Sequence, residues 1–134
     1  MSLETLNLTK NQQTVLDILE SASEPLKAYT ILFDIQKKGI KSPLQVYRAL
    51  DKLIEIGKVH KIESRNSYVA CKHEGCNAKT STSFLICENC DSVTELTGNN
   101  LISYFSKQVE KNNFNYKKHN LEIFGLCENC KLKN

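Results

Sequence analysis

A chain of 134 residues has room for one or two small domains, and domains this small often need a metal ion or disulfides for stability. No run approaches the roughly 18 apolar residues of a membrane helix, and MSLETLNLTKNQQ lacks the pattern of a signal peptide. We therefore expect a cytoplasmic protein without a membrane partner, whose six cysteines are metal ligands rather than disulfides. The net charge of +3 is modest, but residues 37–65 carry eight basic and three acidic residues, which indicates either a polyanion-facing surface or a solvated face.

Three helices are predicted in the first half of the chain. Apolar residues recur at helical spacing over residues 9–22, about 27–38 and 42–57, and a glycine closes the second and third segments. Thr9 and Ser42 are suited to cap the first and third helices, and the proline after Ser42 fits a first helical turn. The third helix is amphipathic, with one apolar and one charged face.

A hairpin is predicted after the helices, because two β-rich runs, KVHKIES and SYVAC, flank Arg65-Asn66. Three helices and then a hairpin are the order of a winged helix-turn-helix, whose last helix enters the DNA major groove. Arginine can bond guanine in bidentate fashion, and tyrosine can contact a phosphate or a thymine methyl group. The expected DNA contacts are Ser42, Gln45, Tyr47, Arg48, Lys52 and Arg65. The alternative for the helix charges is surface ion pairing of Arg48 with Asp51 and of Lys52 with Glu55.

The second half of the chain reads as a separate domain. Residues 72–82 are polar and lack periodicity, so we expect a hinge there. SFLIC and SVTEL predict two strands, residues 99–112 a helix, and NLEIFGLC a third strand. The sequence thus predicts an α+β protein: a winged helix-turn-helix DNA-binding domain over residues 1–71, and over 83–134 a small α/β domain with an antiparallel sheet.

The string CENC occurs twice in the second domain, at Cys87–Cys90 and at Cys127–Cys130. Two intervening residues let both sulfurs of a pair face one ion, and two pairs can supply the four thiolates of a tetrahedral zinc. Four protein ligands leave no open position, so such a site is structural rather than catalytic. A redox dithiol, a pair of free buried cysteines and an iron–sulfur cluster are the alternatives, although neither string has the βαβ setting of a thioredoxin-like motif.

A second group of candidate ligands surrounds the hinge. His60 and Cys71 belong to the hairpin, His73 and Cys76 to the hinge, and Glu95 follows the first CENC string. A thiolate, an imidazole and a carboxylate together suit zinc, and a metal at a domain junction could set the angle between two domains. Taken singly, His60 reads as a strand histidine and Cys71 as a small buried apolar residue. Only the joint pattern predicts a metal site.

These motifs resemble those of the ferric uptake regulator family and, within it, the zinc uptake regulator subgroup. The resemblance covers nearly the whole chain and rests on LTKNQQTVLDIL, SPLQVYRALDKLIEIGKVHKIES, NSYVAC, FLICENCDSVTEL and HNLEIFGLCENC. It implies a homodimer that binds a palindromic operator in double-stranded DNA when zinc is present and represses zinc-acquisition genes. The second domain would then be the dimerisation domain.

The resemblance also implies two zinc ions per chain. The structural zinc maps onto the four residues Cys87, Cys90, Cys127 and Cys130. The sensing zinc maps onto His60, Cys71 and Glu95. The family's fourth sensing ligand, a hinge histidine, has no aligned counterpart, and Cys76, or as a weaker match His73, stands in its place.

The histidine content before the first CENC string bears on which metal is sensed. Iron- and peroxide-sensing relatives carry a histidine-rich run there, whereas this chain reads AKTSTSF, which favours zinc over iron. His119 matches a histidine that serves an additional metal site in some relatives. Without the histidine-rich run, we expect it to be a hydrogen-bonded strand residue.

Three other readings predict different behaviour. A thiol redox enzyme or redox-controlled chaperone would use the CENC pairs for disulfide turnover and hold no tightly bound zinc. An iron- or peroxide-sensing regulator of the same fold would need ferrous iron to bind DNA, and a zinc-ribbon adaptor would leave VYRALDKL unexplained. The sequence has no Ser–His–Asp arrangement, P-loop or paired-carboxylate motif, so we expect neither an enzyme nor a small-molecule substrate.

Overall fold

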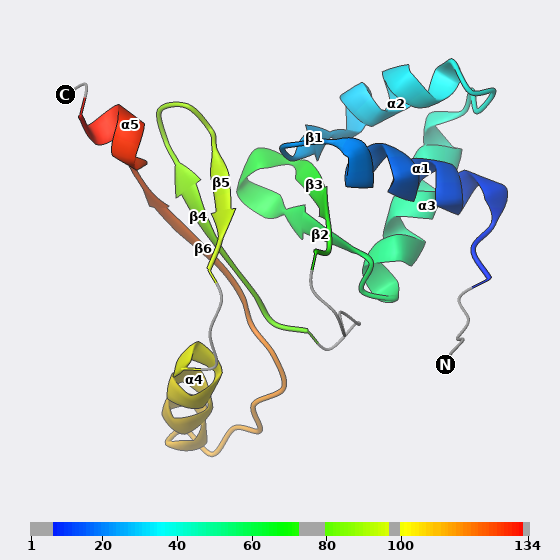
Figure 1. Ribbon diagram of the computed structural model, residues 1–134. Helices are drawn as coiled ribbons and strands as arrows, with labels where there is room; N and C mark the ends of the chain where they lie inside the picture. The colour runs from blue at the N-terminus through cyan, green and yellow to red at the C-terminus, as the bar shows by residue number, and fades with distance from the viewer. Residues whose placement is uncertain (1–6, 73–79, 97–99, 133–134) are drawn as a thin grey trace. The chain divides into compact units, whose positions relative to one another are not determined.

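The computed structural model describes residues 7–72, 80–96 and 100–132, and the chain forms two compact units, Met1–Ala78 and Lys79–Asn134. The first unit contains α1 (Lys10–Ser21), β1 (Leu26–Lys27), α2 (Ala28–Gln36), α3 (Pro43–Glu55), β2 (Val59–Ile62), the short 3-10 helix η1 (Glu63–Arg65) and β3 (Ser67–Ala70), as Figure 1 shows. The second contains β4 (Thr82–Cys87), β5 (Val93–Glu95), α4 (Asn100–Glu110), β6 (Asn120–Gly125) and α5 (Glu128–Lys131). Within the described ranges, no helix has the length and apolar character needed to cross a membrane.

The three helices of the first unit enclose its core. Each helix buries one face, and α1 packs against both α2 and α3. The fully buried side chains of this unit include Val15, Ile31, Ile35, Val46, Leu50, Leu53, Val59 and Ile62. Burying one such side chain contributes about 1.5–3 kcal/mol, so the apolar stripe of α3 holds its charged face outward.

The helix ends follow the local sequence, with one exception. In a capping box at Thr9, its Oγ1 accepts from the Gln12 amide at 3.1 Å and its own amide donates to Gln12 Oε1 at 3.0 Å. At the end of α3, Gly57 has a φ of +82°, and the following amide donates to Leu53 O at 2.8 Å, as in a Schellman motif. Ser42 occupies the N-cap position of α3, but its side chain makes no capping bond, so the capping predicted for it is wrong.

Replacing Thr9 with alanine is expected to lower the free energy of unfolding by about 1 kcal/mol, because the Gln12 amide loses its acceptor. Ser42→Ala is the matched control, since it changes an N-cap residue that makes no side-chain bond, and its effect should stay within about 0.5 kcal/mol. Urea unfolding followed by circular dichroism measures both. Equal losses in the two variants would contradict the capping box.

The hairpin predicted after the helices is present. β2 and β3 pair antiparallel, with Ile62 opposite Ser67, and Asn66 turns the chain with a left-handed φ of 47°. β1 adds to the free edge of β3, which makes the sheet order β1-β3-β2. This strand was not predicted, because two residues are too few to show an alternating pattern. Three helices and this sheet form the winged helix-turn-helix.

The sheet of the second unit is mixed, so the prediction of an antiparallel sheet is wrong for its last strand. The strand order is β5-β4-β6, and β5 runs antiparallel to β4 whereas β6 runs parallel to it. The chain crosses through α4 between β5 and β6, and such a crossover lets β6 run in the direction of β4. Thr82, at the end of the expected hinge, is the first residue of β4, and α5 was not predicted because it has only 4 residues.

Candidate metal centre and DNA-facing surface

The four cysteines of the CENC strings meet at one end of the second unit's sheet. All four sulfur atoms lie within 4.8 Å of one another, and the Sγ atoms of Cys90 and Cys127 are 3.7 Å apart. A tetrahedral zinc with Zn–S bonds of about 2.3 Å has sulfurs about 3.8 Å apart. The donor set and its spacing therefore fit a zinc ion, and we call these four residues the cysteine quartet.

Backbone pairing builds the quartet. Cys87 ends β4 opposite Gly125 of β6, and the amide after Cys87 donates to Gly125 O at 2.8 Å. Asp91, with a left-handed φ of 63°, closes the turn toward β5 by donating its amide to Cys87 O at 2.9 Å. Cys127 is the N-cap residue of α5, which carries Cys130 one turn further on. Parallel pairing of β4 and β6 thus brings together two strings that lie far apart in the sequence.

Hydrogen bonds polarise the quartet sulfurs unequally. The backbone amides of Cys127 and then Cys90 donate toward Cys87 and lower the pKa of its thiol to about 6, and the amide of Cys130 lowers the pKa of Cys127. The Asn89 amide lowers the pKa of Cys130, but the neighbouring thiols, Cys127 foremost, and burial together raise it to about 11. Four thiolates at this distance repel one another, and a divalent cation would offset that repulsion.

Two residues that the sequence reading missed support the quartet. Asn89 Nδ2 donates to Cys130 Sγ at 3.2 Å, and Ser92 Oγ lies 3.2 Å from Cys90 Sγ. Such partners orient metal ligands and tune their basicity. The sequence could have indicated a role for Asn89, because asparagine is the third residue of both CENC strings.

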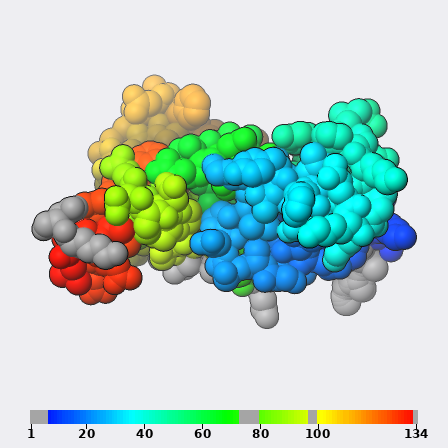
Figure 2. Space-filling model, turned by 90° about the horizontal axis from the view of Figure 1, so that it is seen from above, coloured from blue at the N-terminus to red at the C-terminus, as the bar shows by residue number. Residues whose placement is uncertain are grey.

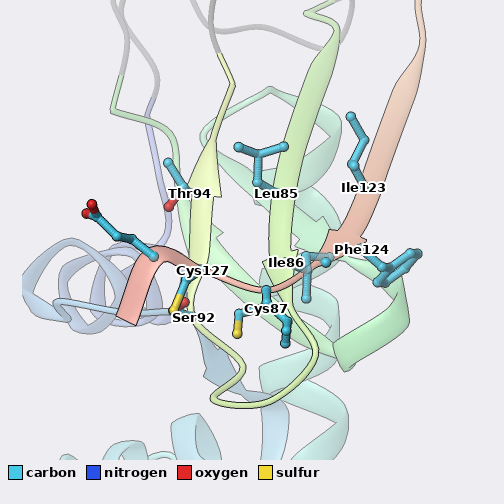
Figure 3. Close-up of a pocket in the computed structure, with 11 residues that line it drawn as sticks. Leu85, Ile86, Cys87, Ser92, Thr94, Ile123, Phe124 and Cys127 are labelled. Atoms are coloured by element: carbon cyan, nitrogen blue, oxygen red, sulfur yellow. The ribbon is translucent and has the colours of Figure 1, made fainter. Parts of the chain in front are cut away.

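An apolar hollow of about 380 Å³ opens beside the quartet, and Cys87 and Cys127 form part of its lining (Figure 3). Leu85 of β4 and Ile123 of β6 are register partners on adjacent strands, and they remain 38% and 40% exposed. Phe124 beside them is 46% exposed. Neither α4 nor β6 has a buried residue in the described part of the chain, so the single chain leaves much of this unit's apolar surface uncovered.

His119 lies directly before β6 and is held by hydrogen bonds. Its Nδ1 is 2.6 Å from the Tyr116 hydroxyl, and its Nε2 is 3.1 Å from Ser83 Oγ. The edge of the ring contacts Phe105 at 5.0 Å between centroids, and burial lowers the pKa of His119. Both ring nitrogens therefore have hydroxyl partners in this arrangement.

Four of the six residues expected to contact DNA lie on α3, whereas Ser42 is its N-cap residue and Arg65 belongs to η1. Gln45, Tyr47, Arg48 and Lys52 are exposed, whereas Ser42 and Arg65 are half-buried. Lys52 pairs with Glu55 at 3.6 Å, but Arg48 has no ion-pair partner within the described ranges. Figure 2 shows the turn between α2 and α3, coloured cyan, at the surface, where the exposed Lys37, Lys38 and Lys41 add positive charge. Exposed side chains of α3 that can bond bases and phosphates thus follow an exposed basic turn along the chain.

The structure describes only some of the residues predicted to bind the sensing zinc. His60 pairs with Val69 across the hairpin, and Cys71 lies two residues beyond Val69, with its amide bonded to Lys58 O at 2.9 Å. Side chains alternate along a strand, so His60 and Cys71 share one face as diagonal neighbours, about 7–8 Å apart at their Cα atoms.

Of the other predicted sensing ligands, only Glu95 lies within the described residues. Glu95 ends β5 in the second unit, and His73 and Cys76 lie outside the described residues. The quartet cysteines are free thiols, but Cys71 is disulfide-bonded, so the expectation that no cysteine forms a disulfide is wrong for Cys71. Reduction restores the thiolate, which is the form that binds metal. The complete sensing site therefore remains a prediction.

Several known proteins are similar to this chain in both sequence and fold. A family model described as the ferric uptake regulator family matches residues 4–124. The zinc uptake regulation protein of Escherichia coli (strain K12) is 33% identical over 126 residues, which cover 93% of this chain and 73% of that protein. A solved structure of holo XcZur is 36% identical, with a TM-score of 0.83 over 96% of this chain and 89% of that chain. A zinc uptake regulator complexed with zinc and DNA is 30% identical, with a TM-score of 0.84 over 97% of this chain and 87% of that one. These matches show that the chain belongs to the ferric uptake regulator family, a family of transcription regulators rather than enzymes.

Proposed function

We propose that this protein is a zinc-responsive repressor whose zinc-bound homodimer binds palindromic operators of zinc-uptake genes in the cytoplasm. The observation that carries the proposal is the cysteine quartet, whose four sulfurs lie within 4.8 Å in a chain that also exposes the charged face of a winged-helix α3. The similarity to a zinc uptake regulation protein, and to a regulator solved with zinc and DNA, supports both the metal and the partner.

The uncovered apolar surface of the second unit supports a homodimer. Leu85, Ile123 and Phe124 are each at least 38% exposed on neighbouring strands. Apolar area left in water costs about 25 cal/mol per Å², which favours covering it with a second copy of the chain. A zinc in the quartet would hold this surface in shape by linking the β4–β5 turn to α5.

The proposed sensing site has a different task. His60, Cys71 and Glu95, with Cys76 as the fourth ligand, would bind a second zinc and thereby select the arrangement of the two DNA-binding units that fits successive major grooves. Linkage requires that operator DNA raises zinc affinity by the same factor by which zinc raises DNA affinity. The quartet zinc would remain bound whether zinc is scarce or plentiful, and the second zinc would make the regulatory decision.

The second candidate is an iron- or peroxide-sensing regulator with the same fold. A solved structure of the ferric uptake regulator from Francisella tularensis with iron shares the fold at a TM-score of 0.66 with 17% identity, which bears on the fold alone. The metal requirement of DNA binding separates the two candidates. A thiol-rich donor set that includes Cys71 favours zinc over ferrous iron.

Metal analysis followed by a zinc titration of operator binding tests the proposal. Reduced, purified protein should contain one tightly held zinc per chain, and a second, weaker equivalent should switch on the mobility shift of operator DNA. Ferrous iron at matched concentration should act weakly or not at all. Zinc-independent binding, or binding that only ferrous iron restores, would refute the proposal.

Arg48→Ala is expected to weaken operator binding by about 1–3 kcal/mol and to relax specificity at one base pair, because Arg48 is exposed on the proposed recognition helix and an arginine can bond guanine in bidentate fashion. Lys52→Ala, one turn further along the same face, is the control for loss of charge. It should weaken all sequences about equally and reduce the slope of log affinity against log salt by about 1. Fluorescence anisotropy on operator and scrambled duplexes at several salt concentrations measures both, and identical behaviour would remove Arg48 from base recognition.

A further inference from the structure

The four quartet sulfurs differ in access to solvent. Cys87 and Cys130 are buried, each 4% exposed, whereas Cys90 is exposed and Cys127 is half-buried. The buried sulfurs also accept hydrogen bonds, from the Cys90 amide to Cys87 and from Asn89 to Cys130. Access from solvent decides which cysteine an oxidant reaches. A small oxidant arriving from solvent therefore meets the sulfur of Cys90 first.

Ser92 Oγ is the nearest polar atom to that sulfur, but the sulfur atom in contact with it comes from the other CENC string. Cys127 Sγ lies 3.7 Å from Cys90 Sγ, and a disulfide of about 2.05 Å needs an approach of less than about 2 Å. Cys90 stands in the turn between β4 and β5, and Cys127 is the N-cap residue of a 4-residue helix. Cys87, by contrast, is fixed in β4 opposite Gly125. Cys90 and Cys127 therefore both lie outside the paired strands.

We infer that Cys90 and Cys127 form a peroxide-sensitive pair whose oxidation to a disulfide releases zinc from the quartet. The inference rests on the structural zinc of the proposed function. The Cys90 thiolate attacks one oxygen of hydrogen peroxide, the O–O bond breaks, and the leaving hydroxide takes a proton from solvent to form water. The Cys127 thiolate then attacks the sulfenic sulfur of Cys90, the S–O bond breaks, and a second water forms in the same way. The two sulfurs lose two electrons, and the peroxide is reduced to two waters.

Zinc takes no part in the electron transfer and remains Zn²⁺. A zinc ion in the quartet would keep only two of its four thiolate ligands, those of Cys87 and Cys130, and its affinity would fall accordingly. The new disulfide joins the β4–β5 turn to α5, so the two strings stay linked without the metal. A reductant reverses the disulfide, after which zinc can bind again.

Disulfide mapping tests the inference without changing any quartet residue. The Cys71→Ser/Cys76→Ser variant leaves the quartet thiols alone, and metal analysis first establishes that it holds one zinc. Hydrogen peroxide is then added, released zinc is followed with a colorimetric chelator, and free thiols are blocked with N-ethylmaleimide. Trypsin with a glutamate-specific protease cuts after Glu88 and Glu128 within both CENC strings and places each quartet cysteine on its own peptide: residues 80–88, 89–95, 123–128 and 129–131.

The expected result is a cross-link between peptides 89–95 and 123–128 that forms at the same rate as zinc is released. When half of the zinc has been released, this cross-link should account for most of the disulfide. Dithiothreitol with added zinc should restore one zinc per chain. A cross-link of 80–88 to 89–95, or zinc release without any disulfide, would overturn the inference. Absence of zinc at the start would instead refute the structural zinc of the proposed function. Wild-type protein should release zinc from the quartet at the same rate, which excludes a role for Cys71 and Cys76.

Discussion

Cys130→Ser is expected to abolish the folded dimer. Cys130 is buried within the quartet and 4% exposed, and serine does not replace a thiolate as a zinc ligand. Structural zinc contributes about 10–16 kcal/mol in small domains, which is comparable with the whole stability of about 5–15 kcal/mol of an ordinary protein. Few side chains are buried in the described part of the second unit, so this unit should unfold when the ion is lost.

Light scattering of the purified variant measures the loss of the dimer, and metal analysis measures the loss of one zinc per chain. A strong chelator applied to the unchanged protein should reproduce both effects. Cys71→Ser is the control, because it removes a cysteine outside the quartet and should leave the tight zinc and the dimer intact. A Cys130→Ser protein that remains dimeric would show that the quartet does not hold the second unit together.

Cys71→Ser is expected to abolish the dependence of operator binding on zinc while leaving a folded dimer. Couplings between an effector site and a ligand site amount to about 1–3 kcal/mol, or roughly 5–150-fold in affinity. The ratio of operator affinities with and without zinc should therefore fall from that range to about 1. His60→Ala should give the same result, since His60 and Cys71 share one face of the hairpin.

Mobility shifts with and without added zinc, in a reducing buffer, measure this ratio. The reductant is required because Cys71 must be a thiolate to bind metal. Val69→Ala is a matched control on the same face of the hairpin, because it removes methyl groups and no ligand. If Cys71→Ser still bound the operator only when zinc was added, the sensing site would lie elsewhere.

Elements with a strong local pattern were predicted from the sequence. The amphipathic α3, the capping residue Thr9 and the glycine after α3 each act over a few neighbouring residues, so their effects can be read along the chain. The hairpin of β2 and β3 is local for the same reason, since its strands are joined by one turn. Ser42 shows the limit of such reading, because a residue type suited to capping makes no capping bond there.

Elements that depend on distant pairing were not predicted correctly. The direction of β6 depends on how the chain returns after α4, and alternation of side chains is the same in parallel and antiparallel strands. β1 exists only because β3 offers it an edge, and Asn89 supports the quartet only because α5 brings Cys130 beside it. None of these contacts leaves a periodic signal in the sequence.

By itself the sequence determined which atoms can bind zinc, because two CENC strings supply four thiolates with a spacing that suits one ion. Only the tertiary structure decided that the two strings meet, since the parallel register of β4 and β6 places Cys87 opposite Gly125 and the four sulfurs within 4.8 Å. It also decided which sulfurs are buried and which face solvent. Burial is a property of the assembled sheet and turns, so Cys90 and Cys130, each the last residue of a CENC string, differ in exposure.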